Sequence, residues 1–537
     1  MKRLLITILL LPLVVSIARG DIIQELIQED NRALRPEYER AKQIYTDLAL
    51  ATYLKASGRF SEAGSVYRKI LATHQTSAFV YTQFASLNLA LQDIKTAQEA
   101  CNRAIEIDPQ KPSAYFLLGQ IEYRRWRHAG GDLNSAIAAY QKVVELDPNH
   151  VDGYRELTNL AIQKKDYNLA VQSLKELTRI MPYQLQFHMG LGSLYSQLGN
   201  RDEAIEAYER VIKIDRDRLP VHKQLAQLYV EKYQEFETQV YNLDIEPTPE
   251  ILDGAEATLK KTIQAYADIR RLVRPKNRAA YDNVIRNSRA RLGSLHLSTE
   301  KIDEAIAVFQ GILDEDAEHI DANYGIGLAY QEAGDTEQAE HHLQRTIELD
   351  PDNKKAYRSL GFLYLSIRKT EESIAVFLKI LDKDVNDTDA HYALGLAYQE
   401  IADFVKAERH LREVIRIDPG NQDAHNALGY LFAELGSNLD EAVELVKKAL
   451  RKSPQNAAYL DSLGWVYYKQ GRLDEALTEL EKAAHYMPDN VEIQDHLGDV
   501  YLKKGQKQKA ILMWQKAIQL EPNNVEIRSK LQKYQPE

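Results

Sequence analysis

The chain has 537 residues, a net charge of −11 and 27% charged side chains. This composition excludes a disordered polar chain and disfavours a protein that binds nucleic acid through bulk positive charge. The single cysteine, Cys101, excludes an internal disulfide. The length suggests several ordinary domains, but a regular internal repeat replaces that expectation, because stacked arrays grow by adding units.

Residues 1–20 have the pattern of an export signal. Lys2 and Arg3 precede a run of about twelve apolar residues, which is short for a membrane span, and small residues lie just before Asp21. The pattern predicts a signal peptide, residues 1–20, that is cleaved before Asp21, with an uncleaved amphipathic anchor as the alternative. No cysteine lies near the cut, so a lipoprotein anchor is not expected. After cleavage we expect no transmembrane helix.

The stretch from Ala457 to Asn490 shows the repeating plan most clearly. Its apolar and small residues, Gly464 among them, recur at helical spacing until Gly471 interrupts the run. A second amphipathic run contains Ala476 and ends at Pro488. Because Gly464 and Ala476 have almost no side chain, the two predicted helices can approach closely there.

The same plan recurs through about thirteen units with a period near 34 residues. The units are 44–77, 78–111, 112–150, 151–184, 185–218, an interrupted one from 219, 286–319, 320–353, 354–387, 388–421, 422–456, 457–490 and 491–524. A helix–turn–helix period of this kind, with these small residues, resembles the tetratricopeptide repeat family. The resemblance implies an all-α, right-handed superhelical solenoid that binds partners mainly on its concave face, which the first helix of each unit lines.

The predicted organisation has six parts. After the signal peptide come an N-terminal capping helix (21–43) and an N-terminal repeat block (44–235). An insertion with a long linking helix (236–276), a C-terminal repeat block (277–524) and a C-terminal cap (525–537) follow. The interruption, near 233–285, contains the acidic stretch Tyr233–Glu250, where Pro247 and Pro249 are expected to prevent a helix. It acts either as a hinge or as a packed wedge. A smaller insertion at Arg125–Asp132 is expected to lengthen a turn.

The second, fifth, ninth and twelfth residues of each unit fall on the partner-binding face that the resemblance implies. In the C-terminal block they form an aromatic track with an acidic border. Such a track suits an extended peptide or an amphipathic helix, and a glycan stacked on the rings is the second choice. The alternative is that the rings only pack between neighbouring first helices. The predicted partner-binding residues are Tyr324, Arg358, Phe362, Tyr392, Asn426, Tyr430, Trp465 and Tyr468.

A basic run follows the interruption and offers a contact for anionic lipid or an acidic partner. The competing interpretation is a solvated helix face, paired with the acidic residues of 233–250. Nucleic acid is not expected as a partner, because no recognised nucleic-acid-binding module is present. The residues of this predicted anionic contact are Arg270, Arg271, Arg274, Lys276 and Arg278.

No motif indicates catalysis, a cofactor or a metal. The sequence contains no nucleophile elbow, phosphate-binding loop, dinucleotide fingerprint or paired metal-ligand motif. His341, His342 and His410 are expected to be surface residues on second helices, and Cys101 a buried small hydrophobe. The chain is therefore interpreted as a non-enzymatic scaffold without catalytic residues, metal ligands or a cofactor.

We expect this scaffold to be exported, and to be periplasmic or peripherally associated with the envelope of a Gram-negative bacterium. It would join proteins of pilus, secretion or polysaccharide-export assembly. The alternative function is recognition of glycan or anionic lipid headgroups. The fold alone does not decide between these functions.

Overall fold

The computed structural model describes residues 35–241 and 246–534. These residues form 27 α-helices, α3 to α29, with one short 3-10 turn and no strand in the described ranges. The predicted all-α repeat solenoid is thereby confirmed. The predicted signal peptide and residues 21–34 of the predicted capping helix lie outside the described residues. None of the described helices combines the length and the hydropathy that crossing a membrane requires.

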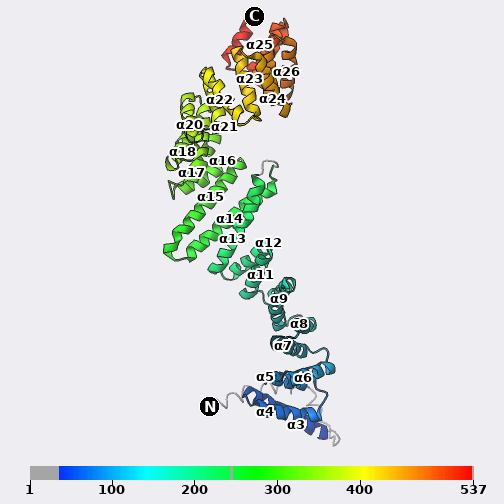
Figure 1. Ribbon diagram of the computed structural model, residues 1–537. Coiled ribbons are helices and arrows are strands. Elements are labelled where there is room, and N and C mark those ends of the chain that lie inside the picture. Colours follow the sequence, from blue (N-terminus) through cyan, green and yellow to red (C-terminus); the bar gives the residue numbers. More distant parts are fainter. Residues whose placement is uncertain (1–34, 242–245, 535–537) are drawn as a thin grey trace. The chain divides into compact units, whose positions relative to one another are not determined.

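Thirteen helix pairs follow one another along the chain, each with a first and a second helix (Figure 1). The first helices are α3 (Arg35–Ala56), α5 (Ala78–Ala90), α7 (Pro112–Ala129), α9 (Val151–Lys164), α11 (Leu185–Leu198), α13 (Leu219–Val240), α15 (Arg278–Ser298), α17 (Ile320–Glu332), α19 (Lys354–Ser366), α21 (Thr388–Glu400), α23 (Gln422–Leu435), α25 (Ala457–Lys469) and α27 (Val491–Lys503).

The second helices pack against these partners in sequence order. They are α4 (Phe60–Thr73), α6 (Ile94–Ile107), α8 (Leu133–Leu146), α10 (Tyr167–Ile180), α12 (Arg201–Ile214), α14 (Pro249–Leu272), α16 (Ile302–Leu313), α18 (Thr336–Leu349), α20 (Thr370–Lys383), α22 (Phe404–Ile417), α24 (Leu439–Lys452), α26 (Leu473–Tyr486) and α28 (Lys507–Leu520). The helix α29 (Val525–Tyr534) follows the last pair, and the 3-10 turn η1 (Pro275–Asn277) separates α14 from α15.

Capping residues in the local sequence determine where the helices of the C-terminal repeats begin and end. Asn456 precedes α25, and its side chain accepts a hydrogen bond from the backbone N–H of Tyr459 at 3.2 Å, which satisfies one free donor of the first turn. Gly471 lies just beyond α25 with φ of +80°, a left-handed conformation that glycine adopts without a steric penalty. The turn between paired helices is therefore encoded by the local sequence.

The predicted close approach of paired helices is present. At Gly464, a Cβ atom would lie 2.6 Å from Cγ of Leu480 and 3.1 Å from the backbone oxygen of Ala476. The equivalent Gly498 faces the indole of Trp514, which is fully buried. A large residue of the second helix thus fills the space that the glycine leaves open, and this packing recurs along the array.

The structure divides into two compact units, residues 1–228 and 229–537. In the first unit, Cys101 is fully buried, as expected, and its thiol donates a hydrogen bond to the backbone oxygen of Ala114 at 3.2 Å. The insertion at Arg125–Asp132 does not mainly lengthen a turn, contrary to the prediction. It extends α7 to 18 residues, with Tyr123 stacked on Trp126 at 5.7 Å.

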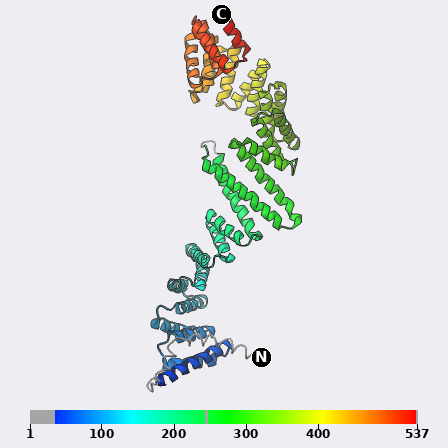
Figure 2. The same cartoon turned by 180° about the vertical axis from the view of Figure 1, so that it is seen from behind.

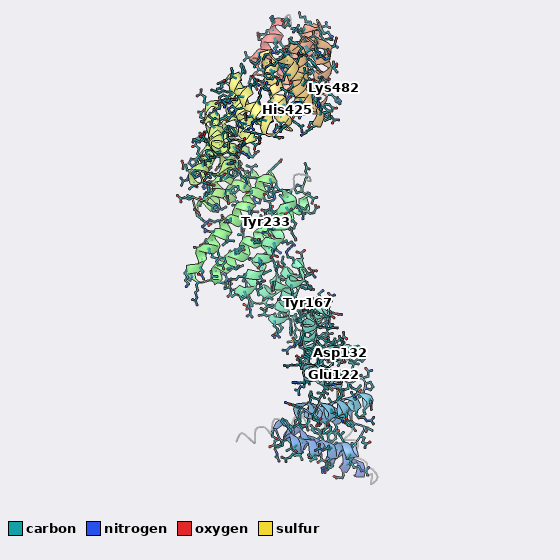
Figure 3. All side chains as sticks on the ribbon, in the orientation of Figure 1. Glu122, Asp132, Tyr167, Tyr233, His425 and Lys482 are labelled. Carbon is teal, nitrogen blue, oxygen red and sulfur yellow. The ribbon has the colours of Figure 1, made fainter. Side chains whose placement is uncertain are left out.

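The second unit begins with a bundle of long helices. The second half of α13 shares a core with α14 and α15. This core includes Tyr233, which Figure 3 labels, together with Leu259 and Leu292. The prediction that prolines prevent a helix in Tyr233–Glu250 was wrong at both ends, because α13 continues to Val240 and α14 begins at Pro249. A proline is favourable at a first helical position, since no backbone N–H is needed there.

A candidate binding face on the first helices

Successive first helices of the second unit contact one another, from α15 through α27. Figures 1 and 2 show the helix pairs of this unit, coloured from green to red, following one another along the sequence. We call the surface formed by the second, fifth, ninth and twelfth residues of each repeat the first-helix face. All eight predicted partner-binding residues lie on helices of this set, α17 to α25.

Among the eight predicted partner-binding residues, Phe362 has the most exposed aromatic ring. Phe362 on α19 is 41% exposed, although its ring edge packs on Phe377 at a centroid distance of 5.2 Å. Tyr324 on α17 is half-buried, and its hydroxyl lies 3.3 Å from that of Ser359. An exposed ring beside a half-buried ring gives a partner an apolar contact surface.

Arg358 is held by two carboxylates at the start of α21. Its guanidinium donates to Asp387 at 2.8 Å and lies 3.0 Å from Asp389. Burial would raise the pKa of Asp387, but the backbone N–H of Ala390 and the charge of Arg358 outweigh it and lower the pKa below its ordinary value. Arg358 therefore joins two repeats and is not a freely available contact.

Tyr392 and Asn426 occupy the middle of the face. Tyr392 is half-buried, and burial followed by the charge of Asp423 raises the pKa of its phenol. Asn426 is half-buried, and its side-chain oxygen has no hydrogen-bond partner within the described part of the chain. An unsatisfied buried oxygen costs free energy, so a donor from a ligand or a water would stabilise this site.

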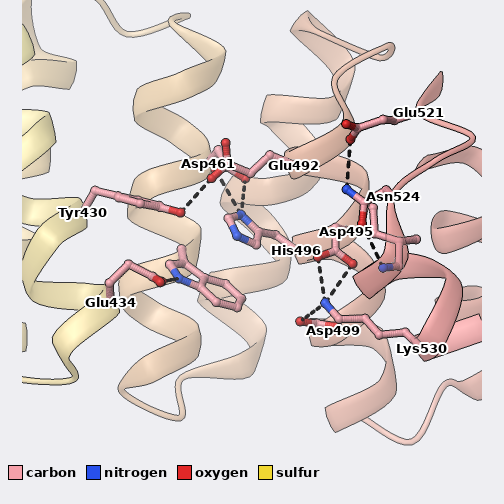
Figure 4. Close-up of polar contacts among 12 residues, drawn as sticks. Tyr430, Glu434, Asp461, Glu492, Asp495, His496, Asp499, Glu521, Asn524 and Lys530 are labelled. Atoms are coloured by element: carbon pink, nitrogen blue, oxygen red, sulfur yellow. Dashed lines mark hydrogen bonds and ion pairs between the residues drawn. The ribbon is translucent and has the colours of Figure 1, made fainter. Parts of the chain in front are cut away.

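The last repeats bring three rings together, which we call the aromatic cluster: Trp465, Tyr468 and His496. The indole of Trp465 stacks on Tyr468 at 4.7 Å and on His496 at 3.9 Å between ring centroids. Trp465 is only 8% exposed, and its indole N–H donates to Glu434 at 2.5 Å (Figure 4). Packing between first helices therefore accounts for most of the surface of this tryptophan.

Acidic groups surround the imidazole of the aromatic cluster. The Nδ1 atom of His496 lies 2.9 and 3.1 Å from the two carboxylate oxygens of Asp461, and both side chains are buried. Burial alone would lower the pKa of His496, but Asp461 outweighs it and raises the pKa above its ordinary value. Glu492 lies beside this pair and accepts a hydrogen bond from the hydroxyl of Tyr430 at 2.7 Å (Figure 4).

The helix α29 closes the end of the first-helix face. Lys530 pairs with Asp495 at 2.7 Å and with Asp499 at 2.9 Å. Ile527 is 2% exposed and belongs to the core of the last repeats. Asp495 and Asp499, which belong to the acidic border expected from the sequence, are thus neutralised within the chain.

The sequence analysis did not select His496 or Glu492. His496 is the sixth residue of its unit, a position that holds Gly325, Ser359, Ala393, Ala427 and Ser462 in the preceding units. The available signal was a bulky titratable residue at a position where each of the five preceding units has a small one. Glu492 occupies a face position in the last repeat, as Asp321 does in an earlier one.

The predicted basic contact lies at the hairpin between α14 and α15. Arg270 pairs with Asp282, and Arg271 lies 3.7 Å from Asp268. Arg274 and Lys276 are exposed and make no ion pair within residues 246–534. The half-buried Arg278 follows η1. Acidic residues of the hairpin itself therefore neutralise only part of the charge.

Two of the three histidines that were expected at the surface are half-buried. His410 on α22 lies 2.8 Å from His391 between their Nδ1 atoms and stacks on Tyr398. The Nδ1 atom of His342 lies 3.1 Å from the side-chain oxygen of Asn323. These rings face the first helix of their own pair, which explains the difference, whereas His341 is exposed as predicted.

Family models match long parts of the chain. Models described as "Tetratricopeptide repeat" match residues 82–151, 185–218, 296–360, 332–397 and 392–457, and a model described as "TPR repeat" matches 464–505 and 498–531. These segments include most units predicted from the spacing of small residues.

Similar proteins come from several functional settings. A peroxisomal targeting signal receptor of Candida albicans is 21% identical over 281 residues, 49% of this chain and 45% of that protein. The human protein O-mannosyl-transferase TMTC1 is 23% identical over 207 residues, 37% of this chain and 23% of that protein. The chain thus spans less than half the length of these relatives.

The crystal structure of the APC/C hetero-tetramer Cut9–Hcn1 aligns with 87% of this chain and 98% of that chain, at 15% identity and a TM-score of 0.38. The matches of the family models, together with the thirteen helix pairs, establish the assignment: the chain belongs to the tetratricopeptide repeat family.

Proposed function

We propose that this tetratricopeptide repeat protein is a non-catalytic scaffold that binds an extended peptide or a helix of a partner protein on the first-helix face of residues 320–469. Relatives with this repeat support the general role of a protein-interaction scaffold. The observation that carries the choice of face is Phe362, a phenylalanine 41% exposed on a first helix between repeats that contribute Tyr324 and Tyr392. Aromatic side chains supply much of the binding energy in such contacts.

The charge of this face indicates what the partner presents. Asp321 and Asp423 are exposed at its border, in addition to Asp389, which pairs with Arg358, and the chain has a net charge of −11. An apolar segment flanked by lysine or arginine would complement such a border and would associate faster at low salt. The partner segment is therefore expected to combine an apolar anchor with basic neighbours.

Exchange of the exposed ring tests the proposal. We expect Phe362→Ala to weaken recovery of a defined partner at least tenfold while the far-UV circular dichroism spectrum is unchanged. Val405→Ala is the matched control, because Val405 is 81% exposed but lies on the second helix α22. Equal loss with both variants, or loss with neither, would refute the assignment of this face.

We also propose that the scaffold acts in the envelope of a Gram-negative bacterium, in pilus, secretion or polysaccharide-export assembly. The support is the signal-like pattern of residues 1–20 in the sequence. A reporter enzyme that is active only after export, fused behind residue 537, should be active in cells. It should lose activity when residues 2–20 are deleted, and activity that persists after the deletion would contradict export by this segment.

The second candidate function is recognition of glycan or anionic lipid headgroups. The observation in its favour is the hairpin with Arg274 and Lys276 exposed beside Arg270 and Arg271. Vesicles containing anionic lipid should then bind the chain, with affinity that decreases as salt increases. Binding that is unchanged in the Arg274→Ala, Lys276→Ala double variant would remove this candidate.

A further inference from the structure

The group of Asp461, Glu492 and His496 has properties that partner binding does not explain. One ligand atom from each of the three residues can be chosen so that all lie within 4.8 Å of one another. Glu492 and His496 are four residues apart on α27, so both project from one side of that helix, while Asp461 comes from the neighbouring first helix α25. The last two repeats therefore contribute jointly to one small polar site.

The charges of the site do not balance. Two carboxylates, Asp461 and Glu492, face a single basic side chain, His496, and the described residues provide neither carboxylate with an ion pair to lysine or arginine. Nearby lysines are already engaged, since Lys530 pairs with Asp495 and Asp499. Because Asp461 is only 5% exposed, water screens the charge of this carboxylate poorly.

We propose that Asp461, Glu492 and His496 form a binding site for a divalent transition-metal ion of the zinc type, which links the last two repeats. One imidazole and two carboxylates are donors that Zn²⁺ accepts, at bond lengths of about 2.0–2.2 Å, and water completes its coordination. The Nδ1 atom of His496 gives its proton to solvent as the metal binds. The ion then compensates the negative charge of the two carboxylates.

The surroundings hold the ligand side chains in place. The hydroxyl of Tyr430 donates to one carboxylate oxygen of Glu492 at 2.7 Å and so orients this side chain. The indole of Trp465 stacks on His496 at 3.9 Å and restricts rotation of the imidazole. Outer hydrogen bonds of this kind orient metal ligands, and their loss typically weakens metal binding about 10–100-fold.

Titration of the purified chain with Zn²⁺ tests the site. Isothermal calorimetry on the chelator-treated full chain should show one ion bound per chain, and Co²⁺ should give visible absorption bands of a His–carboxylate site. The main variant is Glu492→Gln, since Glu492 is exposed and its exchange spares the core. We expect this exchange to weaken binding by more than about 100-fold, because it removes a ligand rather than an outer contact.

The controls separate a specific site from general metal affinity. Glu526→Gln makes the same change at an exposed position of α29 and should bind Zn²⁺ as the wild type does. Tyr430→Phe should weaken binding about 10–100-fold without abolishing it. The proposal is overturned if no stoichiometric binding occurs, or if Glu492→Gln and Glu526→Gln bind equally, which would assign the metal to surface histidines such as His341. Loss of Phe362-dependent partner binding would leave these results unchanged.

Discussion

Substitution of Gly464 by alanine tests the close packing on which the repeat depends. The new Cβ atom would lie 2.6 Å from Cγ of Leu480, and 3.1 Å from the backbone oxygen of Ala476. Cγ is the branch point of a fully buried side chain, and the oxygen belongs to the backbone of α26, so neither can move without separating the helices. Overpacking of this kind typically costs about 1–3 kcal/mol.

A competing effect has the opposite sign. Alanine is favoured over glycine in a helix interior by about 1 kcal/mol. Because two contacts at Gly464 are too short, we expect overpacking to prevail and the free energy of unfolding to fall by about 1–2 kcal/mol. At Gly190 on α11, the added Cβ would meet only methyl groups of Leu174 at 3.4 and 3.5 Å, so Gly190→Ala should stabilise the chain slightly.

Urea denaturation followed by tryptophan fluorescence provides the measurement. Two of the three tryptophans, Trp465 and Trp514, lie in the last two repeats, so the fluorescence signal reports mainly on the region that contains Gly464. Circular dichroism should accompany it, because repeat arrays do not always unfold in one step. If Gly464→Ala stabilises the chain as much as Gly190→Ala does, the close-packing explanation is refuted.

Three further predictions concern His410, Cys101 and Lys530, side chains that are buried or half-buried. Burial, and next the neighbouring His391, lower the pKa of His410 from 6.5 to about 4. Between these values the unfolded state binds more protons, so stability should fall as the pH decreases from about 6.5 to 4. The difference in melting temperature between the wild type and His410→Gln should therefore change within this window and stay constant outside it, and a difference that does not vary with pH would contradict the reasoning. Burial raises the pKa of the Cys101 thiol to about 12, so a thiol reagent at pH 8 should modify it only in denaturant, and modification of the native chain would show that the site opens. Lys530→Ala leaves Asp495 and Asp499 without their cation, so amide hydrogen exchange in α29 should accelerate while exchange in α17 is unchanged. If α29 exchanges at the same rate in the variant and the wild type, the ion pairs do not hold this helix.

Much of the fold could be predicted because the repeat signal is local. The spacing of Gly464 and Ala476 marks where two helices meet, and the same spacing recurs along the chain. The errors lie where a residue has two possible roles. Pro249 was interpreted as a helix breaker, although it occupies the first position of α14, where proline is favourable. Similarly, the residues after Arg125 continue α7 instead of forming a turn.

The candidate site was less accessible to sequence reasoning. Trp465 and Tyr468 lie three residues apart on one helix, a spacing that brings side chains together, and their rings stack at 4.7 Å. The pairing of Asp461 with His496, 35 residues away, depends on how one repeat stacks on the next. The sequence also did not show which rings are buried. Trp465 is 8% exposed, whereas Phe362, at the equivalent ninth position of its unit, is 41% exposed. Only the structure distinguishes the ring that packs from the ring that remains available.

Photo-crosslinking in cells tests the central claim, partner binding on the first-helix face, most directly. A photoreactive amino acid is placed at position 362 on this face, or at position 405 on the second helix α22. A protein scaffold that uses the first-helix face should give a defined crosslinked partner from position 362 and none from position 405. The same products from both positions, or only abundant bystander proteins from position 362, would contradict it.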